Sequence, residues 1–108
     1  MPVCHQIILC TCPDQASAEK IARLLVANHL AACVNILPGI RSIYAWQGQI
    51  ESAQEHLLLI KVNKDHYAAV ESAITASHPY ELPEIIAVAI ENGLPEYLNW
   101  IDLCHASK

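Results

Sequence analysis

The sequence predicts an α+β fold in which two helices cover one face of an antiparallel sheet. Two observations carry this prediction. Apolar runs of strand length alternate with segments of helical periodicity, and they follow one another as strand, helix, strand, strand, helix, strand, with a short helix at the end. The 108 residues are the usual size of one domain, and we expect residues 1–108 to form a single domain.

The N-terminal part of the chain predicts a strand and then a helix. Residues 6–12 form a continuous apolar run that stops at Pro13, which is typical of a central strand. Asp14 can cap a helix, and from Ala18 onward apolar residues recur every three or four positions. This periodicity predicts an amphipathic helix over residues 15–28.

The middle of the chain predicts a long hairpin. Residues 32–46 are rich in β-branched and aromatic side chains but contain Pro38 and Gly39; because proline cannot donate to a central ladder, we expect an edge strand with a bulge. Gly48 supplies the turn, and residues 49–62 form the returning strand. Both strands exceed the usual length of about 5–6 residues roughly twofold or more, so one domain's sheet cannot cover them completely.

The C-terminal part predicts a helix, a strand and a last short helix. Asn63 can cap a helix over residues 64–77, which ends ahead of Pro79. Residues 85–90 form the fourth strand, and Pro95 opens the third helix. The resulting βαββαβ order with an added C-terminal helix is the ferredoxin-like arrangement.

Charge and composition exclude several classes of protein. The chain has 6 basic and 11 acidic residues, which are scattered along it, so we expect neither nucleic acid nor an anionic membrane as a partner. No apolar stretch approaches the ~20 residues that span a bilayer, and the N-terminus lacks the pattern of a signal peptide. We therefore expect a cytoplasmic protein whose five cysteines, an odd number without framework spacing, are reduced.

Several motifs in a fixed order indicate one family. Together they cover about residues 7–101. They are Leu9-Cys10-Thr11-x-Pro13-Asp14, Leu30-Ala31-Ala32-Cys33, Leu37-Pro38-Gly39, Tyr44-x-Trp46-x-Gly48, His78-Pro79-Tyr80-x-x-Pro83-Glu84 and Tyr97-Leu98-x-Trp100. On these motifs the chain resembles the CutA1 proteins, which are named for divalent cation tolerance. The resemblance implies a tight homotrimer similar to the PII signalling proteins, and a role in tolerance to copper and other divalent metals.

The resemblance also implies Cys10 and His78 as metal ligands. Cys10 matches the cysteine of the family's proposed copper site, and a thiolate suits Cu(I) or Zn(II). His78 matches the second of two adjacent histidines, but Ser77 stands at the first. We therefore expect weak, thiol-dependent binding of copper or another divalent metal ion.

Structural roles remain open for these residues. An unpaired cysteine such as Cys10 among apolar residues is usually a packing residue of the core, and His78 is equally suited to capping a helix end. Cys12 lies on the same strand face as Cys10, but C-x-C spacing without a further pair does not predict a closed zinc site. The other histidines have no ligand-like spacing and are expected on the surface: His5, His29, His56, His66 and His105.

Aromatic and acidic residues are candidates for a trimer interface or an inter-subunit pocket. Aromatic side chains supply much of the buried area in cores and interfaces. The aromatic candidates are Tyr44, Trp46, Tyr80, Tyr97 and Trp100. Glu84 is the main charged candidate. Glu51, Glu81 and the basic Lys61 are further candidates, although exposed charges are usually just solvated.

Two functions remain open on the sequence. The first is a trimeric, metal-responsive binding protein of the divalent-cation tolerance type. The second is a PII-like trimeric sensor or scaffold that binds a small metabolite or a partner protein in clefts between subunits. We do not expect an enzyme, because residues 11–14 lack an Arg or Gly that would cradle an anion and no nucleophile motif is present.

Overall fold

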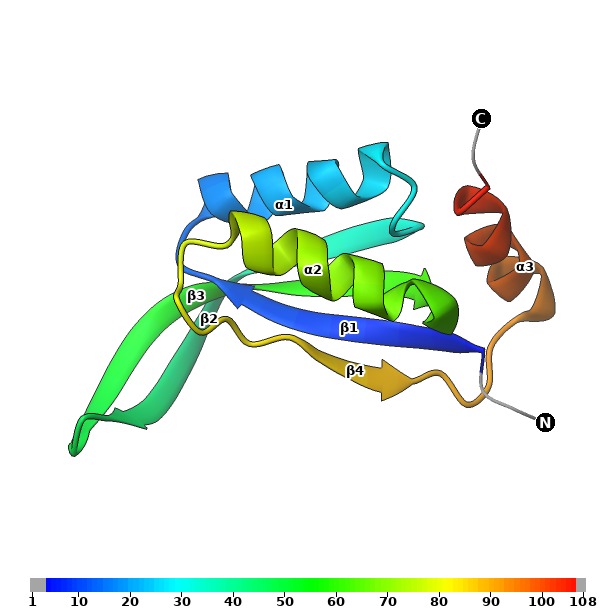
Figure 1. The fold of residues 1–108 in the computed structure, drawn as a ribbon. Coiled ribbons are helices and arrows are strands. Elements are labelled where there is room, and N and C mark those ends of the chain that lie inside the picture. Colours follow the sequence, from blue (N-terminus) through cyan, green and yellow to red (C-terminus); the bar gives the residue numbers. More distant parts are fainter. Residues whose placement is uncertain (1–3, 107–108) are drawn as a thin grey trace.

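Four strands form one antiparallel sheet in the computed structural model, which describes residues 4–106, and helices α1 and α2 lie side by side on one face of the sheet (Figure 1). The strands are β1 (His5–Cys12), β2 (Cys33–Trp46), β3 (Gln49–Asn63) and β4 (Ile86–Ala89), and the helical elements are α1 (Gln15–Ala27), the 3-10 turn η1 (Lys64–His66), α2 (Tyr67–Ser77) and α3 (Pro95–Cys104). The strand order is β2-β3-β1-β4, so β1 and β3 are central. This arrangement confirms the predicted α+β, ferredoxin-like fold with an added C-terminal helix.

The central strands build the core because their apolar side chains alternate toward the helices. Ile8 of β1 and Leu58 and Ile60 of β3 are fully buried. Leu25 of α1 and Ile74 of α2 belong to the same buried cluster. Complete burial of a side chain of this size contributes about 1.5–3 kcal/mol, so this cluster holds the helices on the sheet.

The second helix begins later than predicted. We expected a helix over residues 64–77, whereas η1 comes first and α2 follows. The side chain of Asn63 accepts a hydrogen bond from the N–H of Asp65 at 2.9 Å, and this short local bond favours a tight turn over a full α-helical start. The fourth strand is also shorter than the predicted 85–90, because β4 pairs with β1 over only four residues.

β2 and β3 form a long hairpin whose far end projects beyond the helices (Figure 1). The pairing of the two strands shifts between Leu37 and Ile40, which confirms the predicted edge strand with a bulge at Pro38 and Gly39. Gly39 has a φ of +74°, a left-handed conformation that glycine adopts without steric cost. The far end is poorly covered, since Ile50 is 82% exposed.

α3 packs at the end of the sheet that lies away from the hairpin tip (Figure 1). Its attachment depends on histidines. The Nε2 of His105 accepts a hydrogen bond from the N–H of Asn63 at 2.9 Å, and the Nε2 of His5 lies 3.0 Å from a carboxylate oxygen of Asp102. The rings of His66 and His105 stack with their centroids 3.6 Å apart. The five remaining histidines, which we expected on the surface, are each half-buried.

Candidate metal site

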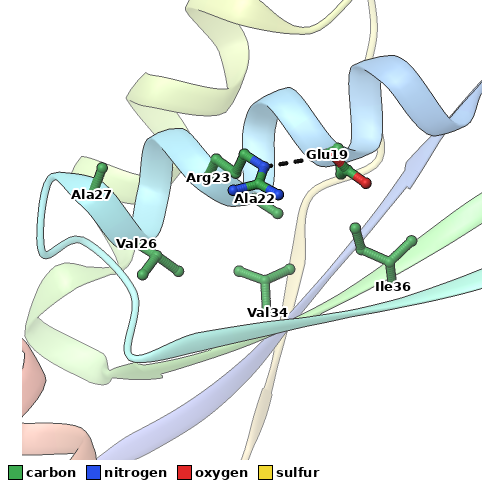
Figure 2. A pocket seen from close by; sticks show the side chains of 7 residues that line it. All are labelled: Glu19, Ala22, Arg23, Val26, Ala27, Val34 and Ile36. Carbon is green, nitrogen blue, oxygen red and sulfur yellow. Dashed lines mark hydrogen bonds and ion pairs between the residues drawn. The ribbon is translucent and has the colours of Figure 1, made fainter.

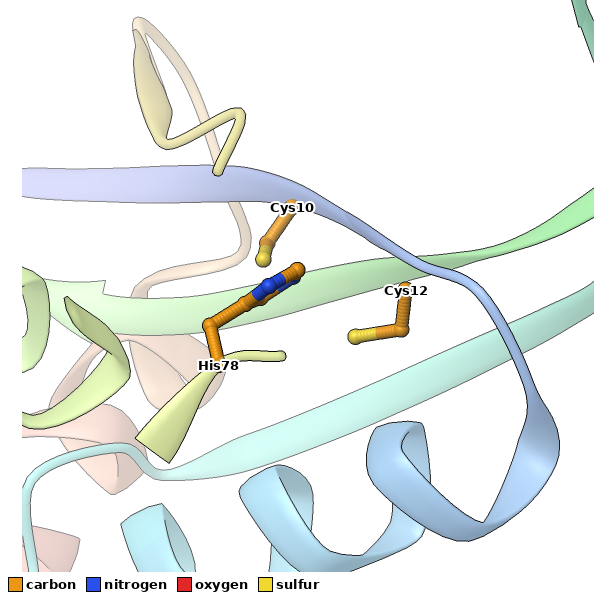
Figure 3. Close-up of side chains that lie close together, drawn as sticks. All are labelled: Cys10, Cys12 and His78. Atoms are coloured by element: carbon orange, nitrogen blue, oxygen red, sulfur yellow. The ribbon is translucent and has the colours of Figure 1, made fainter. Parts of the chain in front are cut away.

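Two cysteines and one histidine meet where β1 and α2 end. Cys10 and Cys12 are two residues apart on β1, so both side chains leave the same face of the strand. His78 follows the last residue of α2 and has an extended backbone, with φ −76° and ψ 139°, as expected for the residue before a proline. Figure 3 shows the three side chains pointing toward one another, with the imidazole between the two thiol side chains.

The distances within this group suit a metal ion. One ligand atom from each of the three residues lies within 4.8 Å of the other two. Both cysteines are 0% exposed and His78 is 9% exposed. Around a tetrahedral zinc ion, with Zn–S of about 2.3 Å and Zn–N of about 2.0–2.1 Å, ligand atoms lie roughly 3.3–3.8 Å apart. Small side-chain movements therefore suffice to bring all three ligand atoms onto one ion.

Hydrogen bonds fix the tautomer of His78. Its Nδ1 accepts a hydrogen bond from the N–H of Tyr80 at 3.0 Å, so its Nε2 carries the proton and donates to the carbonyl oxygen of Thr11 at 2.8 Å. A metal-bound histidine normally donates its other ring N–H to such an oxygen. Nδ1 is therefore the nitrogen suited to a metal ion, and the N–H of Tyr80 is the group that the ion would displace.

The two thiols form a coupled pair. The pKa of Cys10 is raised, first by the hydrogen bond that its thiol makes with Cys12 and then by burial. The pKa of Cys12 is lowered, because the same hydrogen bond from Cys10 stabilises its thiolate. Of the two thiols, Cys12 therefore loses its proton more readily.

Nearby carboxylates add negative charge to the site. Glu84 and Glu55 both raise the pKa of Cys10 after the causes above. Glu55 is 6% exposed and accepts a hydrogen bond from the hydroxyl of Tyr80 at 2.6 Å. Burial, followed by the contact with Glu55, raises the pKa of Tyr80 above its usual value, so this tyrosine remains a neutral donor. The local field therefore favours a bound cation.

The structure brings together only part of the predicted site residues. The candidate ligands Cys10 and His78 lie in one group, and the ring of Tyr80 is 5.0 Å from that of His78. The other candidates for an interface or an inter-subunit pocket are spread over the chain and are exposed: Tyr44 and Trp46 on the hairpin, Glu84 before β4, and Trp100 on α3. They do not form one pocket within the part of the chain that the structure describes, and their place between subunits stays a prediction.

Cys12 is the ligand candidate that sequence reasoning missed. Its C-x-C spacing with Cys10 is a weak signal by itself, but strand alternation places both thiols on one face. The missing information was the approach of His78, which depends on how the end of α2 packs over β1. A search for Cys, His and acidic residues on alternate strand positions would have found the pair.

A separate groove lies between α1 and β2 (Figure 2). Its volume is about 480 Å³, and its seven lining residues are Glu19, Ala22, Arg23, Val26, Ala27, Val34 and Ile36. Arg23 donates to Glu19 at 3.5 Å across one turn of the helix. Because none of these side chains is a cysteine or histidine, the groove has no soft ligands for a metal ion.

The fold and this group define a class: small α+β proteins with a buried set of two thiols and an imidazole, which are the ligand types preferred by soft and borderline divalent metals. Comparison with known protein families agrees with this class. Residues 6–104 match the family described as CutA1 divalent ion tolerance protein. The chain belongs to the CutA1 family, as its motifs predict.

Named relatives cover nearly the whole chain. The divalent-cation tolerance protein CutA of Yersinia pestis is 42% identical over 96 residues, which are 89% of this chain and 81% of that protein. The crystal structure of CutA from Xylella fastidiosa has 53% identity and a TM-score of 0.93, covering 94% of this chain and 98% of that one. The structure of the periplasmic divalent cation tolerance protein CutA from Archaeoglobus fulgidus has 42% identity and a TM-score of 0.92, covering 94% and 99%.

Membership of the family leaves the location of the chain open. Among residues 4–106, no helix combines the length and the apolar character needed to cross a membrane. The Archaeoglobus fulgidus relative is described as periplasmic. A cytoplasmic location for this chain therefore stays a prediction.

Proposed function

We propose that this chain is a metal-responsive binding protein that holds Cu(I), or a divalent ion such as Zn(II), through Cys10, Cys12 and His78. The observation that carries the proposal is the mutual approach of their ligand atoms to within 4.8 Å. Thiolates and a neutral imidazole are the ligands that copper and zinc prefer. The role is one of binding, and it is in keeping with a family of divalent-cation tolerance proteins.

Metal binding in this site is coupled to protons. The thiols must be deprotonated to bind, and the pKa of Cys10 is raised by its hydrogen bond with Cys12 and by burial. Each thiol gives up its own proton when it binds the cation, so protons are released on binding and affinity falls on acidification. The bond from Nε2 of His78 to Thr11 stays in place and orients the ring.

We also propose that the chain assembles as a homotrimer. Three exposed apolar side chains of the hairpin support this: Ile43, Trp46 and Ile50 are 70%, 56% and 82% exposed. β2 lies at the edge of the sheet, and its free backbone groups favour pairing with another chain. A symmetric ring of copies would bury these features, and Tyr44 and Trp100 are candidates for the same contacts.

Calorimetric titration of the reduced protein with Zn(II) and with Cu(I), under anaerobic conditions, tests the metal proposal. Cys10→Ser and Cys12→Ser should each weaken binding by at least about 10–100-fold, the scale known for lesser changes around metal ligands. His78→Ala should weaken it as well. Cys104→Ser is the matched control, because this cysteine is half-buried and lies outside the group.

Equal affinity in the wild type and in all these variants would contradict the proposal. Cys10 and Cys12 would then be core residues and His78 a helix cap. The hypothesis of a PII-like sensor or scaffold would take its place, with a small metabolite or a partner protein bound between subunits. A metabolite that raises the melting temperature of the metal-free protein would identify that function.

A further inference from the structure

One more imidazole lies beside the metal site, on the neighbouring strand. His56 of β3 is directly opposite Cys12 in the antiparallel pairing of β1 with β3. Residues opposite one another in such a ladder point to the same face of the sheet, with their Cβ atoms about 4.5–5.5 Å apart. The side chain of His56 therefore starts from the same face as the thiol of Cys12.

The inward nitrogen of this imidazole has no hydrogen-bond partner. Within residues 4–106, the Nδ1 of His56 is a buried side-chain atom that makes no hydrogen bond. Buried polar atoms are nearly always paired, and each exception needs an explanation. Gln6 and His66 contain the two other such atoms, but neither is paired with a residue of the metal site.

The metal group itself lacks one ligand. Cys10, Cys12 and His78 supply three ligand atoms, whereas a closed zinc site is four-coordinate and tetrahedral, with Cys2His2 among its common sets. His56 is not one of the mutually close residues. Its ring must therefore turn about its side-chain bonds to reach the ion, while the paired backbones of β1 and β3 stay in place.

We propose that His56 is the fourth ligand, so that Cys10, Cys12, His78 and His56 form a closed tetrahedral Cys2His2 site for Zn(II). This inference rests on the proposed function and adds to it the coordination of the bound ion and the identity of the metal. The unpartnered Nδ1 gains a ligand bond when the ion is present. The site then has no open position for water or for a substrate.

Co(II) in place of Zn(II) tests the inference, because its visible spectrum reports the geometry and the ligands around the ion. We expect wild-type protein to bind Co(II) with an intense tetrahedral spectrum that added azide does not change, since a closed site offers no exchangeable position. His56→Gln should open that position, so that azide changes the spectrum. Zn(II) affinity, measured by competition with a chelator, should fall by about 10–100-fold.

Two further variants make the result specific. His66→Gln removes another half-buried imidazole with an unpartnered buried nitrogen, far from this site in the sequence, and should behave as wild type. His56→Cys should restore a spectrum that azide does not change, because a thiolate again fills the fourth position. Circular dichroism of each variant establishes that it is folded.

The outcomes separate this inference from the proposed function. Two results would show that His56 is not the fourth ligand: a wild-type Co(II) spectrum that azide already changes, or a His56→Gln protein with wild-type affinity and spectrum. In both cases Cys10→Ser would still abolish binding, and the proposed function would stand. A wild type that bound Cu(I) but neither Zn(II) nor Co(II) would likewise overturn the closed zinc site. If the wild type bound none of the three ions, the proposed function itself would fail.

Discussion

Tyr80 connects the loop after α2 to the long hairpin through a single hydrogen bond. Its hydroxyl donates to Glu55 of β3 at 2.6 Å, and that carboxylate is 6% exposed. The backbone N–H of Tyr80 also donates to Nδ1 of His78. One residue thus supports both a buried acid and the orientation of a candidate ligand, in addition to its predicted place at an interface.

Replacing Tyr80 with Phe should destabilise the protein. The substitution keeps the ring but leaves the carboxylate of Glu55 without its donor, and an unsatisfied buried acceptor costs about 1–3 kcal/mol. Urea unfolding of the two proteins measures this difference. Tyr97→Phe is the control, because the hydroxyl of Tyr97 makes only a 3.8 Å contact with the sulfur of Cys33. Equal losses in both variants would show that the bond to Glu55 contributes nothing specific.

The site residues differ in how far the sequence could predict them. Cys10 and His78 lie in family motifs, so they could be named without a structure. The role of Cys12 depends on its proximity to His78, and that of His56 on the register between two strands that are far apart in sequence. Such non-local geometry has no signal in residue spacing along the chain.

At the scale of elements, α3 depends on the uncharged ring of His105. The Nε2 of His105 accepts the N–H of Asn63, and its Nδ1 then donates to the carbonyl of His29 at 2.9 Å. Its ring also stacks on His66. The pKa of His66 is lowered, first by burial and then by His105, with a smaller opposing effect of Asp65.

Acidification should therefore loosen α3. The pKa of His66 is lower when α3 is docked, so the undocked state takes up a proton more readily. The docking of α3 is therefore fully stable above the ordinary histidine pKa of about 6.5 and weakens as the pH falls below that value. A charged His66 would also lie against the ring of His105 that stacks on it, although Asp65 offsets part of this cost. Hydrogen exchange of the α3 amides at pH 7.5 and 5.5, corrected for intrinsic rates, should show lower protection at pH 5.5. Unchanged protection would rule out this dependence.

Most elements follow from local sequence, and their deviations have local causes. The run that ends at Pro13 and the cap at Asp14 were sufficient for β1 and α1, where the side chain of Asp14 accepts the N–H of Ser17 at 2.7 Å. The late start of α2 depends on the bond from Asp65 to Asn63. A capping residue can be read from sequence, but the number of residues in the turn that it closes cannot.

At the scale of the whole molecule, the long hairpin is unexplained by a single chain. Strand lengths of 14 and 15 residues for β2 and β3 agree with the predicted ranges. The far end of the hairpin projects beyond the helices (Figure 1), and Ile43, Trp46 and Ile50 on it are exposed. Sequence could indicate that this surface needs a partner, but the arrangement of copies around it is not encoded in any local pattern.

Native mass spectrometry at micromolar concentration should find a trimer. Thermal unfolding should show that this trimer resists heat, because an interface adds a second core to a small domain. Trp46→Ala should lower the melting temperature and loosen the trimer together. Leu103→Ala removes another exposed apolar side chain, 63% exposed on α3, and serves as the control. A stable monomer, or a Trp46→Ala protein unchanged in both properties, would contradict the proposed assembly.

The most direct test of the metal site is X-ray absorption at the zinc edge of reduced protein loaded with one equivalent of Zn(II). The site built on Cys10, Cys12 and His78 predicts two sulfur neighbours at about 2.3 Å and imidazole nitrogen at about 2.0–2.1 Å. In Cys10→Ser and in Cys12→Ser the sulfur count should fall to one or the ion should be lost. A wild-type ion surrounded by oxygen and nitrogen alone would contradict the account.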